Sequence, residues 1–367
     1  MTTYLFAGGG TAGHVNPLLA TADRLKDRHP EASVLVLGTA EGLEARLVPL
    51  RGYELLTIAR LPFPRRPNAA ALRFPKNFGT AVAETRAIIR DRGVDVVVGF
   101  GGYASAPAYI AAWREKVPLV VHEANAKPGI ANRLGSWVTK HVGVAFASTR
   151  LRHSTLVGMP LRREVETLDR HAERAAAIRY FKLDDTKPTL LVTGGSSGAR
   201  SINATVSKAI ALILGAGWQV VHIAGANSEI TDPALAGYRL LKYCDRMELA
   251  MAVADLAVSR AGSATVSEFS AVGVPAVYVP YAHGNGEQRF NAVDAVEAGG
   301  ALLVADADFT PDWVLSMLVP LLLDRALIAE MAANLTSVGL LDGADRMVDL
   351  IDDAVTTRSP AQPPPAQ

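Results

Sequence analysis

Residues 5–14 (LFAGGGTAGH) and residues 191–200 (LVTGGSSGAR) are the two stretches that decide the fold. Each begins with a short apolar run, passes through a glycine-rich turn and continues into a helical pattern. A strand, a glycine-rich loop and a helix in this order are typical of the first unit of a doubly wound α/β domain. Because the unit occurs twice, we expect two such domains.

Short runs rich in Val, Ile and Leu recur along the chain, and most of them precede a glycine-rich turn and a helical pattern. Strands that are apolar along their whole length lie in parallel sheets with helices on both faces. We therefore expect two parallel, doubly wound sheets that bind ligands at the carboxyl ends of their strands. The predicted strands are residues 4–7, 34–37, 94–98, 119–121, 142–146, 190–193, 220–224, 256–259, 276–279 and 302–305.

The boundary between the domains is expected near residue 160, in the stretch 157–162 (VGMPLR) with its glycine and proline. We expect an N-terminal domain over residues 1–160 and a C-terminal domain over residues 161–343. A terminal helix at about 344–354 is expected to pack back on the N-terminal domain. The tail, residues 356–367, contains four prolines and is expected to be disordered.

The composition excludes several classes of protein. The 367 residues include 37 Lys and Arg against 36 Asp and Glu, and the net charge of +1 gives no drive toward nucleic acid. The single cysteine, Cys244, excludes an intrachain disulfide and a cysteine-based zinc site, which fits a reducing, cytoplasmic compartment.

Residues 209–228 carry no Lys, Arg, Asp or Glu, but Gly215 and Gly217 divide them into a helix and a strand. We therefore expect no transmembrane segment, and the N-terminus lacks the pattern of a secretory signal.

The first glycine-rich loop, residues 8–13 (GGGTAG), satisfies a Gly-x-Gly-x-x-Gly pattern, whose backbone N–H groups can cradle a phosphate. A dinucleotide-binding domain also needs an acidic residue at the end of its second strand, where this chain has Gly38 and Thr39. Glu41 and Glu44 come later. A nicotinamide-dependent dehydrogenase is therefore a weaker alternative, because the acidic residue that its cofactor needs is missing at this position. A Walker-type nucleotide site is excluded more clearly, since neither glycine-rich loop ends in Gly-Lys-Ser/Thr.

Two polar groups follow strands of the first half. His14 lies at a helix N-terminus, whose positive end disfavours the imidazolium form, and a neutral imidazole can act as a general base. The alternative is that His14 only hydrogen-bonds its own loop. Residues 122–125 (HEAN) lie at another strand end, where they either contact a ligand or form a structural network.

The second half offers three further candidates. In residues 259–268 (SRAGSATVSE), Thr265 and Glu268 fit a capping box, and the alternative is that Glu268 binds ribose hydroxyls while the helix N-terminus faces a diphosphate. Residues 283–291 (HGNGEQRFN) are dense in polar side chains, which favours ligand binding. Residues 306–308 (DAD) formally match a metal-binding Asp-x-Asp, but a solvated turn explains them better, and no histidine spacing indicates a metal.

One stretch is basic and free of acidic residues. Residues 55–83 carry five basic side chains, Arg60, Arg65, Arg66, Arg73 and Lys76, interleaved with apolar ones. Such a stretch can insert at an anionic lipid surface, and the alternative is an ordinary loop whose aromatic side chains pack under the domain. The apolar side chains are Leu61, Phe63, Leu72, Phe74 and Phe78.

Taken in order, these motifs resemble the MurG family of peptidoglycan glycosyltransferases, which belongs to the two-domain GT-B class. The resemblance covers nearly the whole chain, and the joint order of the motifs is more specific than any one of them. The matching stretches are residues 8–14, 99–105, 122–125, 157–162, 194–200, 259–268 and 284–289.

The resemblance implies a GT-B fold, with two doubly wound domains facing an interdomain cleft. It implies transfer of N-acetylglucosamine from UDP-GlcNAc to the 4-hydroxyl of undecaprenyl-diphospho-MurNAc-pentapeptide (lipid I), with inversion and without a metal or cofactor, to give lipid II. It also implies a peripheral protein at the cytoplasmic face of the cell membrane. The N-terminal domain would be acceptor-binding and membrane-associated, and the C-terminal domain would bind the UDP-sugar.

The resemblance assigns roles to individual residues, with His14 as the catalytic base. Contacts to UDP-GlcNAc are assigned to Thr11, Ala12, Gly13, Asn125, Arg162, Ser196, Cys244, Ser263, Ala264, Thr265, Val266, Ser267, Glu268 and Gln288. Contacts to an anionic membrane surface are assigned to Arg65, Arg66, Leu72, Arg73, Phe74, Lys76 and Phe78.

The chain departs from the family pattern at Ala12, Ala124, Met159 and Ser197, where Gly, Gln, Asn and Gln are common. The methyl group of Ala12 would tighten the donor pocket or oppose a positive φ. Related enzymes with this fold are alternatives: a transferase for a soluble acceptor and a UDP-sugar 2-epimerase. A non-enzymatic membrane-bound scaffold is an alternative of another class.

Overall fold

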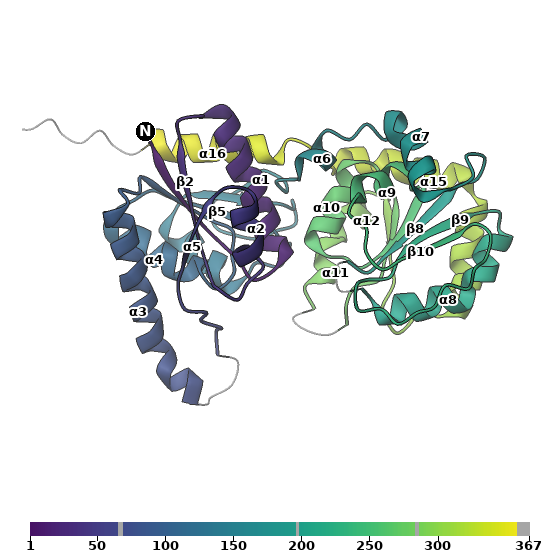
Figure 1. Ribbon diagram of the computed structural model, residues 1–367, viewed down its shortest axis with the longest axis horizontal. Coiled ribbons are helices and arrows are strands. Elements are labelled where there is room, and N and C mark those ends of the chain that lie inside the picture. Colours follow the sequence, from purple (N-terminus) through teal and green to yellow (C-terminus); the bar gives the residue numbers. More distant parts are fainter. Residues whose placement is uncertain (65–68, 196–197, 283–285, 358–367) are drawn as a thin grey trace, which may run out of the picture. The chain divides into compact units, whose positions relative to one another are not determined.

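The computed structural model describes residues 1–64, 69–195, 198–282 and 286–357 (Figure 1). Its contacts divide the chain into two units, which we call the N-terminal unit and the C-terminal unit. The N-terminal unit consists of Met1–Leu161 together with the residues from Asp342 onward, and the C-terminal unit is Arg162–Leu341.

The N-terminal unit contains a seven-stranded, fully parallel sheet in the order β3-β2-β1-β4-β5-β6-β7. The chain moves outward from β1 to β3 and then returns to place β4 beside β1, which makes the gap between β1 and β4 the topological switch point. The strands are β1 (Thr3–Ala7), β2 (Ser33–Gly38), β3 (Glu54–Thr57), β4 (Val96–Gly99), β5 (Leu119–Glu123), β6 (His141–Val144) and β7 (Ser154–Leu156). The helices are α1 (Ala12–Arg28), α2 (Glu44–Leu50), α3 (Ala69–Asp91), α4 (Ser105–Glu115), α5 (Ile130–Val138) and α16 (Gly343–Thr356).

The C-terminal unit contains a six-stranded parallel sheet in the order β10-β9-β8-β11-β12-β13, with its switch point between β8 and β11. The strands are β8 (Thr189–Thr193), β9 (Gln219–Ile223), β10 (Tyr238–Leu241), β11 (Leu256–Ser259), β12 (Ala276–Tyr278) and β13 (Ala301–Leu303). The helices are α6 (Arg163–Glu166), α7 (Arg170–Phe181), α8 (Arg200–Gly215), α9 (Met247–Val253), α10 (Ser263–Ala271), α11 (Gln288–Asn291), α12 (Val293–Glu297), α13 (Pro311–Trp313), α14 (Val319–Leu323) and α15 (Arg325–Asn334), with a π-helical turn at Val314–Leu318 and a 3₁₀ turn at Leu335–Ser337.

The strands of the sheet interiors are mostly apolar because both faces of each sheet are covered. In β1, Leu5 and Ala7 pack into one hydrophobic cluster, whereas Tyr4 and Phe6 pack into another on the opposite face. Alternate side chains of a strand point to opposite faces, so a strand covered on both sides is apolar at most positions, and polar exceptions such as His122 and His222 are hydrogen-bonded. The predicted fold class of two doubly wound parallel sheets is confirmed.

Three strands were not predicted, and each lies at the edge of a sheet. All residues of β7 are exposed, β3 has exposed residues at both ends, and β10 buries only Tyr238. An edge strand has a neighbour on one side only, so its sequence is not a continuous apolar run.

The C-terminal helix α16 packs on the N-terminal unit, beside α1 (Figure 1). Its residues Met347, Val348 and Ile351 are fully buried in the cluster that contains Phe6. Asp345 of this helix pairs with Arg28 of α1 at 2.6 Å. The helix extends to Thr356 and Thr357 follows it as the C-cap, so the predicted disorder is wrong for these two residues, and residues 358–367 lie outside the described residues.

None of the helices in the described part of the chain combines the length and apolar character that crossing a bilayer requires. The uncharged stretch 209–228 divides as predicted, between the end of α8 and strand β9.

Candidate active site

The glycine-rich loop after β1 lies at the switch point of the N-terminal unit, where its backbone contacts the loop after β4. A Cβ atom at Gly102 would lie 2.4 Å from the carbonyl oxygen of Gly9, so a side chain there would separate the two loops. Gly10 has a φ of +88°, a conformation that favours glycine. Helix α1 begins at Ala12, so this residue is helical and its methyl group meets no positive φ.

His14 lies in the first turn of α1, and its two ring nitrogens differ. Nδ1 lies 3.1 Å from the carbonyl oxygen of Gly9, which can only accept, so this hydrogen bond assigns the proton to Nδ1. The Thr11 hydroxyl lies 3.3 Å from the same nitrogen. Nε2 then keeps its lone pair, and a Cβ atom at Gly101 would lie 3.1 Å from it. The loop hydrogen bond and the function of a general base are compatible, because the first uses Nδ1 and the second needs Nε2.

Glu44, which the sequence did not identify as a site residue, places its carboxylate against the same loop. Oε2 accepts the N–H of Gly10 at 2.7 Å, and Oε1 accepts the N–H and the hydroxyl of Thr39 at 2.9 and 2.8 Å. Burial acts to raise the pKa of Glu44, but the hydrogen bonds from Gly10, from a backbone N–H of Glu44 and from Thr39 hold it below its usual value. This loop was expected to offer its N–H groups to phosphate, and one of them is bound by a carboxylate of the protein instead.

The motif of residues 122–125 at the end of β5 forms a buried network. Nε2 of His122 donates to the carbonyl oxygen of Gly158 at 3.0 Å, and burial lowers the pKa of His122 to about 4. Glu123 accepts the backbone N–H of Asn125 and the side-chain amide of Asn132, both at 2.9 Å. The side-chain amide nitrogen of Asn125 donates to the same carboxylate at 3.3 Å. The side-chain carbonyl oxygen of Asn125 therefore points away from Glu123. The network therefore orients Asn125.

Helix α10 provides the corresponding site in the C-terminal unit. The helix begins at Ser263, and Gly262 is its N-cap, without a side-chain cap. The capping box predicted from Thr265 and Glu268 is therefore wrong, because Thr265 lies inside the first turn and not at the N-cap. Of the helix residues assigned to the donor, Val266 packs its side chain in the core, so only its backbone can contact a ligand.

Glu268 pairs with Arg162. Nη2 and Nε of Arg162 lie 3.1 and 3.3 Å from Oε1 of Glu268. Burial raises the pKa of Glu268, and the positive charge of Arg162 offsets part of this effect. Burial would lower the pKa of Arg162, but Glu268 raises it. A cation and a carboxylate, the two groups expected to bind diphosphate and ribose, are thus in contact.

Three more residues assigned to the donor lie on other segments. Cys244, in the loop after β10, is partly buried, and burial raises the pKa of its thiol. The side-chain oxygen of Gln288, at the start of α11, accepts the N–H of Tyr281 at 2.9 Å. Ser196 lies outside the described residues.

Residues 306–308 form a turn, as predicted, and Asp308 is exposed, but Asp306 is partly buried and belongs to a polar network. Its carboxylate pairs with the guanidinium of Arg260 and accepts the hydroxyl of Ser201 at 2.6 Å. Arg260 also donates to the carbonyl oxygen of Val279 at 2.9 Å. In the described residues, no group of three or more His, Cys, Asp or Glu side chains is placed to hold a metal ion.

The basic stretch near residue 70 is a helix, α3, over part of its length. Leu72 is 85% exposed, and Arg73 and Lys76 are also exposed. Phe74 and Phe78 stack on one another and are partly buried against the core, so only part of each side chain is exposed. Arg65 and Arg66 lie outside the described residues.

Exposed aromatic and aliphatic side chains on the neighbouring helices were missed by the sequence analysis. Trp113 on α4 is 60% exposed, and Ile130 and Trp137 on α5 are 64% and 71% exposed. Helix α4 packs against both α3 and α5. The guanidinium of Arg152 lies 4.3 Å from the ring centroid of Trp137, which adds a cation to this surface. A lone Trp in an amphipathic helix gives no signal in sequence that it faces solvent.

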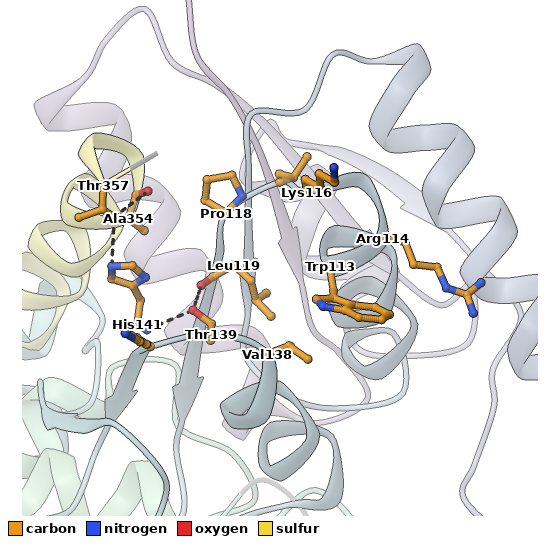
Figure 2. A pocket seen from close by; sticks show the side chains of 12 residues that line it. Trp113, Arg114, Lys116, Pro118, Leu119, Val138, Thr139, His141, Ala354 and Thr357 are labelled. Carbon is orange, nitrogen blue, oxygen red and sulfur yellow. Dashed lines mark hydrogen bonds between the residues drawn. The ribbon is translucent and has the colours of Figure 1, made fainter. Parts of the chain in front are cut away.

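A cavity of about 780 Å³ lies in the N-terminal unit at the amino ends of β5 and β6 (Figure 2). Trp113 and Lys116, from the end of α4, line it together with Thr139 and His141. His141 is held from α16 by Asp353, with Nε2 and Oδ2 3.1 Å apart. Ligands of doubly wound sheets bind at the opposite, carboxyl edge, so the cavity is not part of the candidate active site.

Two family models match the chain. The glycosyltransferase family 28 N-terminal domain matches residues 4–144, and the glycosyltransferase family 28 C-terminal domain matches residues 189–347. A curated relative from Leifsonia xyli subsp. xyli is 63% identical over 96% of this chain and 98% of its own length. A relative from Streptomyces coelicolor is 45% identical over 97% of this chain and 99% of its own length. Both are named "UDP-N-acetylglucosamine--N-acetylmuramyl-(pentapeptide) pyrophosphoryl-undecaprenol N-acetylglucosamine transferase".

Solved structures agree with the fold. The crystal structure of Acinetobacter baumannii MurG superposes with a TM-score of 0.80 at 28% identity, covering 96% of this chain and all of that one. UDP-GlcNAc 2-epimerase from Neisseria meningitidis superposes with a TM-score of 0.66 at 14% identity, over 96% of this chain and 100% of that one. At that identity the second likeness concerns the fold alone.

Proposed function

The chain belongs to glycosyltransferase family 28, and on this basis we propose that it transfers N-acetylglucosamine from UDP-GlcNAc to the 4-hydroxyl of lipid I, with inversion, to form lipid II. The observation that carries the proposal is the 63% identity over 96% of the chain to a relative named for this transfer. Transfer to a saccharide hydroxyl needs a base for the hydroxyl proton and a counter-charge for the departing UDP.

His14 is the proposed base. Its Nδ1–H is bound to the Gly9 carbonyl, so the lone pair of Nε2 is available to take the proton of the acceptor hydroxyl. As the hydroxyl loses its proton to Nε2, its oxygen attacks the anomeric carbon and the bond from that carbon to the diphosphate breaks. The imidazolium that forms keeps its hydrogen bond to Gly9, and no proton moves at Nδ1.

The C-terminal unit supplies the counter-charge in this proposal. UDP leaves as an anion, and a guanidinium stabilises the charge that develops on its diphosphate. Arg162 provides that cation, and the first N–H groups of α10 are unsatisfied within the helix and can add hydrogen bonds. Glu268, on the same helix, is the proposed acceptor for the ribose hydroxyls.

We also propose that the N-terminal unit binds an anionic membrane surface from the cytoplasmic side, as a peripheral protein. Three observations support this: the exposed Leu72 next to the exposed Arg73 and Lys76 of α3, the exposed Trp113 on α4 and the exposed Trp137 on α5. Apolar side chains enter the lipid interface while cations hold the headgroups. The lipid-linked acceptor then reaches the enzyme without leaving the membrane.

UDP release from UDP-GlcNAc in the presence of a water-soluble lipid I analogue tests the function. We expect release only when the analogue is present, and slower release from UDP-glucose and UDP-GalNAc. Epimerisation of UDP-GlcNAc without any acceptor would support the 2-epimerase alternative, and a shift of NADH fluorescence on mixing would support a dehydrogenase. Either result, without acceptor-dependent UDP release, overturns the proposal.

A further inference from the structure

Glu44 and His14 bind the two ends of one peptide group. The N–H of Gly10 donates to Oε2 of Glu44 at 2.7 Å, and the carbonyl oxygen of Gly9 accepts from Nδ1 of His14 at 3.1 Å. This N–H and this carbonyl belong to the same peptide unit, which joins Gly9 to Gly10. A continuous chain of hydrogen bonds therefore runs from the carboxylate, through one peptide, to the imidazole.

The carboxylate is a fixed part of the fold. Glu44 is fully buried, and Thr39 holds Oε1 with both its N–H and its hydroxyl. A Cβ atom at Gly9, Gly38 or Gly42 would lie 2.3, 2.5 or 2.0 Å from an atom of the Glu44 side chain. Three positions around this carboxylate thus have glycine where any other residue would displace it.

A carboxylate bound to a peptide N–H makes the carbonyl of the same peptide a stronger acceptor. Hydrogen bonds in a chain polarise one another, and the effect is larger when one member is charged and the surroundings are buried. A stronger acceptor at Gly9 holds the Nδ1–H tautomer of His14 and fixes the ring plane. It also stabilises the imidazolium that forms when Nε2 takes a proton, as a carboxylate does when it contacts a catalytic histidine directly.

We propose that Glu44 is a positioning residue of the transfer reaction, acting on the base His14 through the Gly9–Gly10 peptide. The proposal rests on the proposed function, because it assumes that His14 is the base. Glu44 remains a carboxylate throughout: the acceptor proton moves to Nε2 of His14, and Nδ1 keeps its own proton.

Among the described residues, His122 interacts electrostatically with His14. Burial lowers the pKa of His122 to about 4, so this ring is uncharged near neutral pH. The hydrogen bonds of Gly10 and Thr39 hold the pKa of Glu44 below its usual value, so the carboxylate is charged there. A shift of the acidic limb of the pH profile in a Glu44 variant therefore reports on His14.

The test compares Glu44→Gln with Thr39→Val in the full-length protein. Thr39→Val removes the hydroxyl that donates to Oε1 of Glu44, and Glu44→Gln replaces one of the two accepting oxygens by an amide nitrogen, so both variants lose buried hydrogen bonding at this side chain. Only Glu44→Gln removes the negative charge next to the peptide that holds His14. We expect Glu44→Gln to lower kcat by about tenfold, to leave the KM for UDP-GlcNAc unchanged, and to move the acidic limb of the kcat profile to lower pH by about 0.5 unit. Thr39→Val should melt at a similarly reduced temperature but keep the wild-type acidic limb.

A spectroscopic measurement does not depend on activity. In ¹⁵N-histidine spectra, with His14 assigned from the His14→Ala variant, we expect the Nδ1–H tautomer to dominate in the wild type and to decrease in Glu44→Gln. An unchanged tautomer in a folded Glu44→Gln protein overturns the proposal. If the tautomer changes but His14→Ala retains wild-type turnover, His14 is not the base. That result overturns both the base assignment in the proposed function and this inference.

Discussion

Arg162 and Glu268 lie 106 positions apart in sequence and form an ion pair, with Nη2 3.1 Å from Oε1. Each group is assigned to a different part of UDP-GlcNAc, and in this structure each satisfies the other. The second oxygen of Glu268, Oε2, accepts no hydrogen bond within the described residues. A donor can therefore bind Glu268 through Oε2 while Arg162 keeps its partner, or it can draw Arg162 toward the diphosphate.

Replacing Glu268 by Gln should weaken donor binding. The amide cannot accept hydrogen bonds from two ribose hydroxyls with the strength of a carboxylate, so we expect the Kd for UDP-GlcNAc to rise by about 10- to 100-fold. The melting temperature should change little, because the Gln oxygen can still accept from Arg162. Glu164→Gln is the matched control, since Glu164 is an exposed carboxylate two positions from Arg162. A lower melting temperature with an unchanged Kd would assign Glu268 a structural role only.

Charge reversal on α3 should weaken membrane binding. Arg73→Glu or Lys76→Glu places an anion beside the exposed Leu72, and each basic residue near an anionic surface contributes about 1 kcal/mol at moderate salt. We expect each variant to reduce the fraction that sediments with phosphatidylglycerol-containing vesicles by about fivefold, and the loss to shrink at high salt. Arg46→Glu, on α2 at the opposite face of the sheet, should sediment like the wild type. Equal losses in all three variants would contradict a membrane face at α3.

The exposed tryptophans should contribute to lipid binding without contributing to folding. Trp113→Ala and Trp137→Ala remove side chains that are 60% and 71% exposed, so the melting temperature should change little. Vesicle binding should decrease at high salt as well as low salt, because insertion of an apolar ring is not screened. Tyr180→Ala, in the C-terminal unit, removes a ring that is 49% exposed and is the matched control. If vesicle binding is unchanged in both tryptophan variants, the lipid contact does not include α4 and α5.

Stability should fall as the pH drops from about 6.5 toward 4, because His222 is buried as the neutral ring. The Tyr238 hydroxyl donates to Nδ1 at 2.7 Å, and Nε2 donates to Asn203 at 3.0 Å. Burial lowers the pKa of His222 to about 4 from the ordinary value of 6.5, so below 6.5 the unfolded chain takes up a proton that the folded chain does not. The loss approaches about 3 kcal/mol near pH 4. Thermal unfolding checks this: His222→Gln should reduce the pH dependence but not remove it, because burial also lowers the pKa of His122 to about 4, whereas replacing the exposed His171 should leave it unchanged.

The fold could be predicted because its central strands are apolar on both faces. Leu5 and Phe6 point to opposite sides of β1 and are both buried, so they give the run that marks a buried parallel strand. The strands at the sheet edges could not be predicted in this way. Ser154, the first residue of β7, is exposed, and nothing in a short polar strand distinguishes it from a loop.

The candidate site was predictable only where a residue lies next to its motif. His14 follows the glycine-rich loop directly, so the sequence identified it. Glu44 comes 30 positions after His14 and reaches the loop because residues 39–43 join the end of β2 to the start of α2. The glycines at positions 38 and 42 were the available signal, since they leave room for its side chain. The Thr265–Glu268 spacing was misleading, because a capping box and a ligand-binding carboxylate have the same pattern.

Turnover of the His14→Ala variant, with donor affinity determined separately by titration calorimetry, tests most directly whether His14 Nε2 is the base of glycosyl transfer. We expect kcat to fall by about 10²- to 10⁴-fold while the Kd for UDP-GlcNAc keeps its wild-type value, because the imidazole acts on the acceptor hydroxyl. Turnover near the wild-type rate, or a loss explained entirely by weaker donor binding, would contradict the assignment.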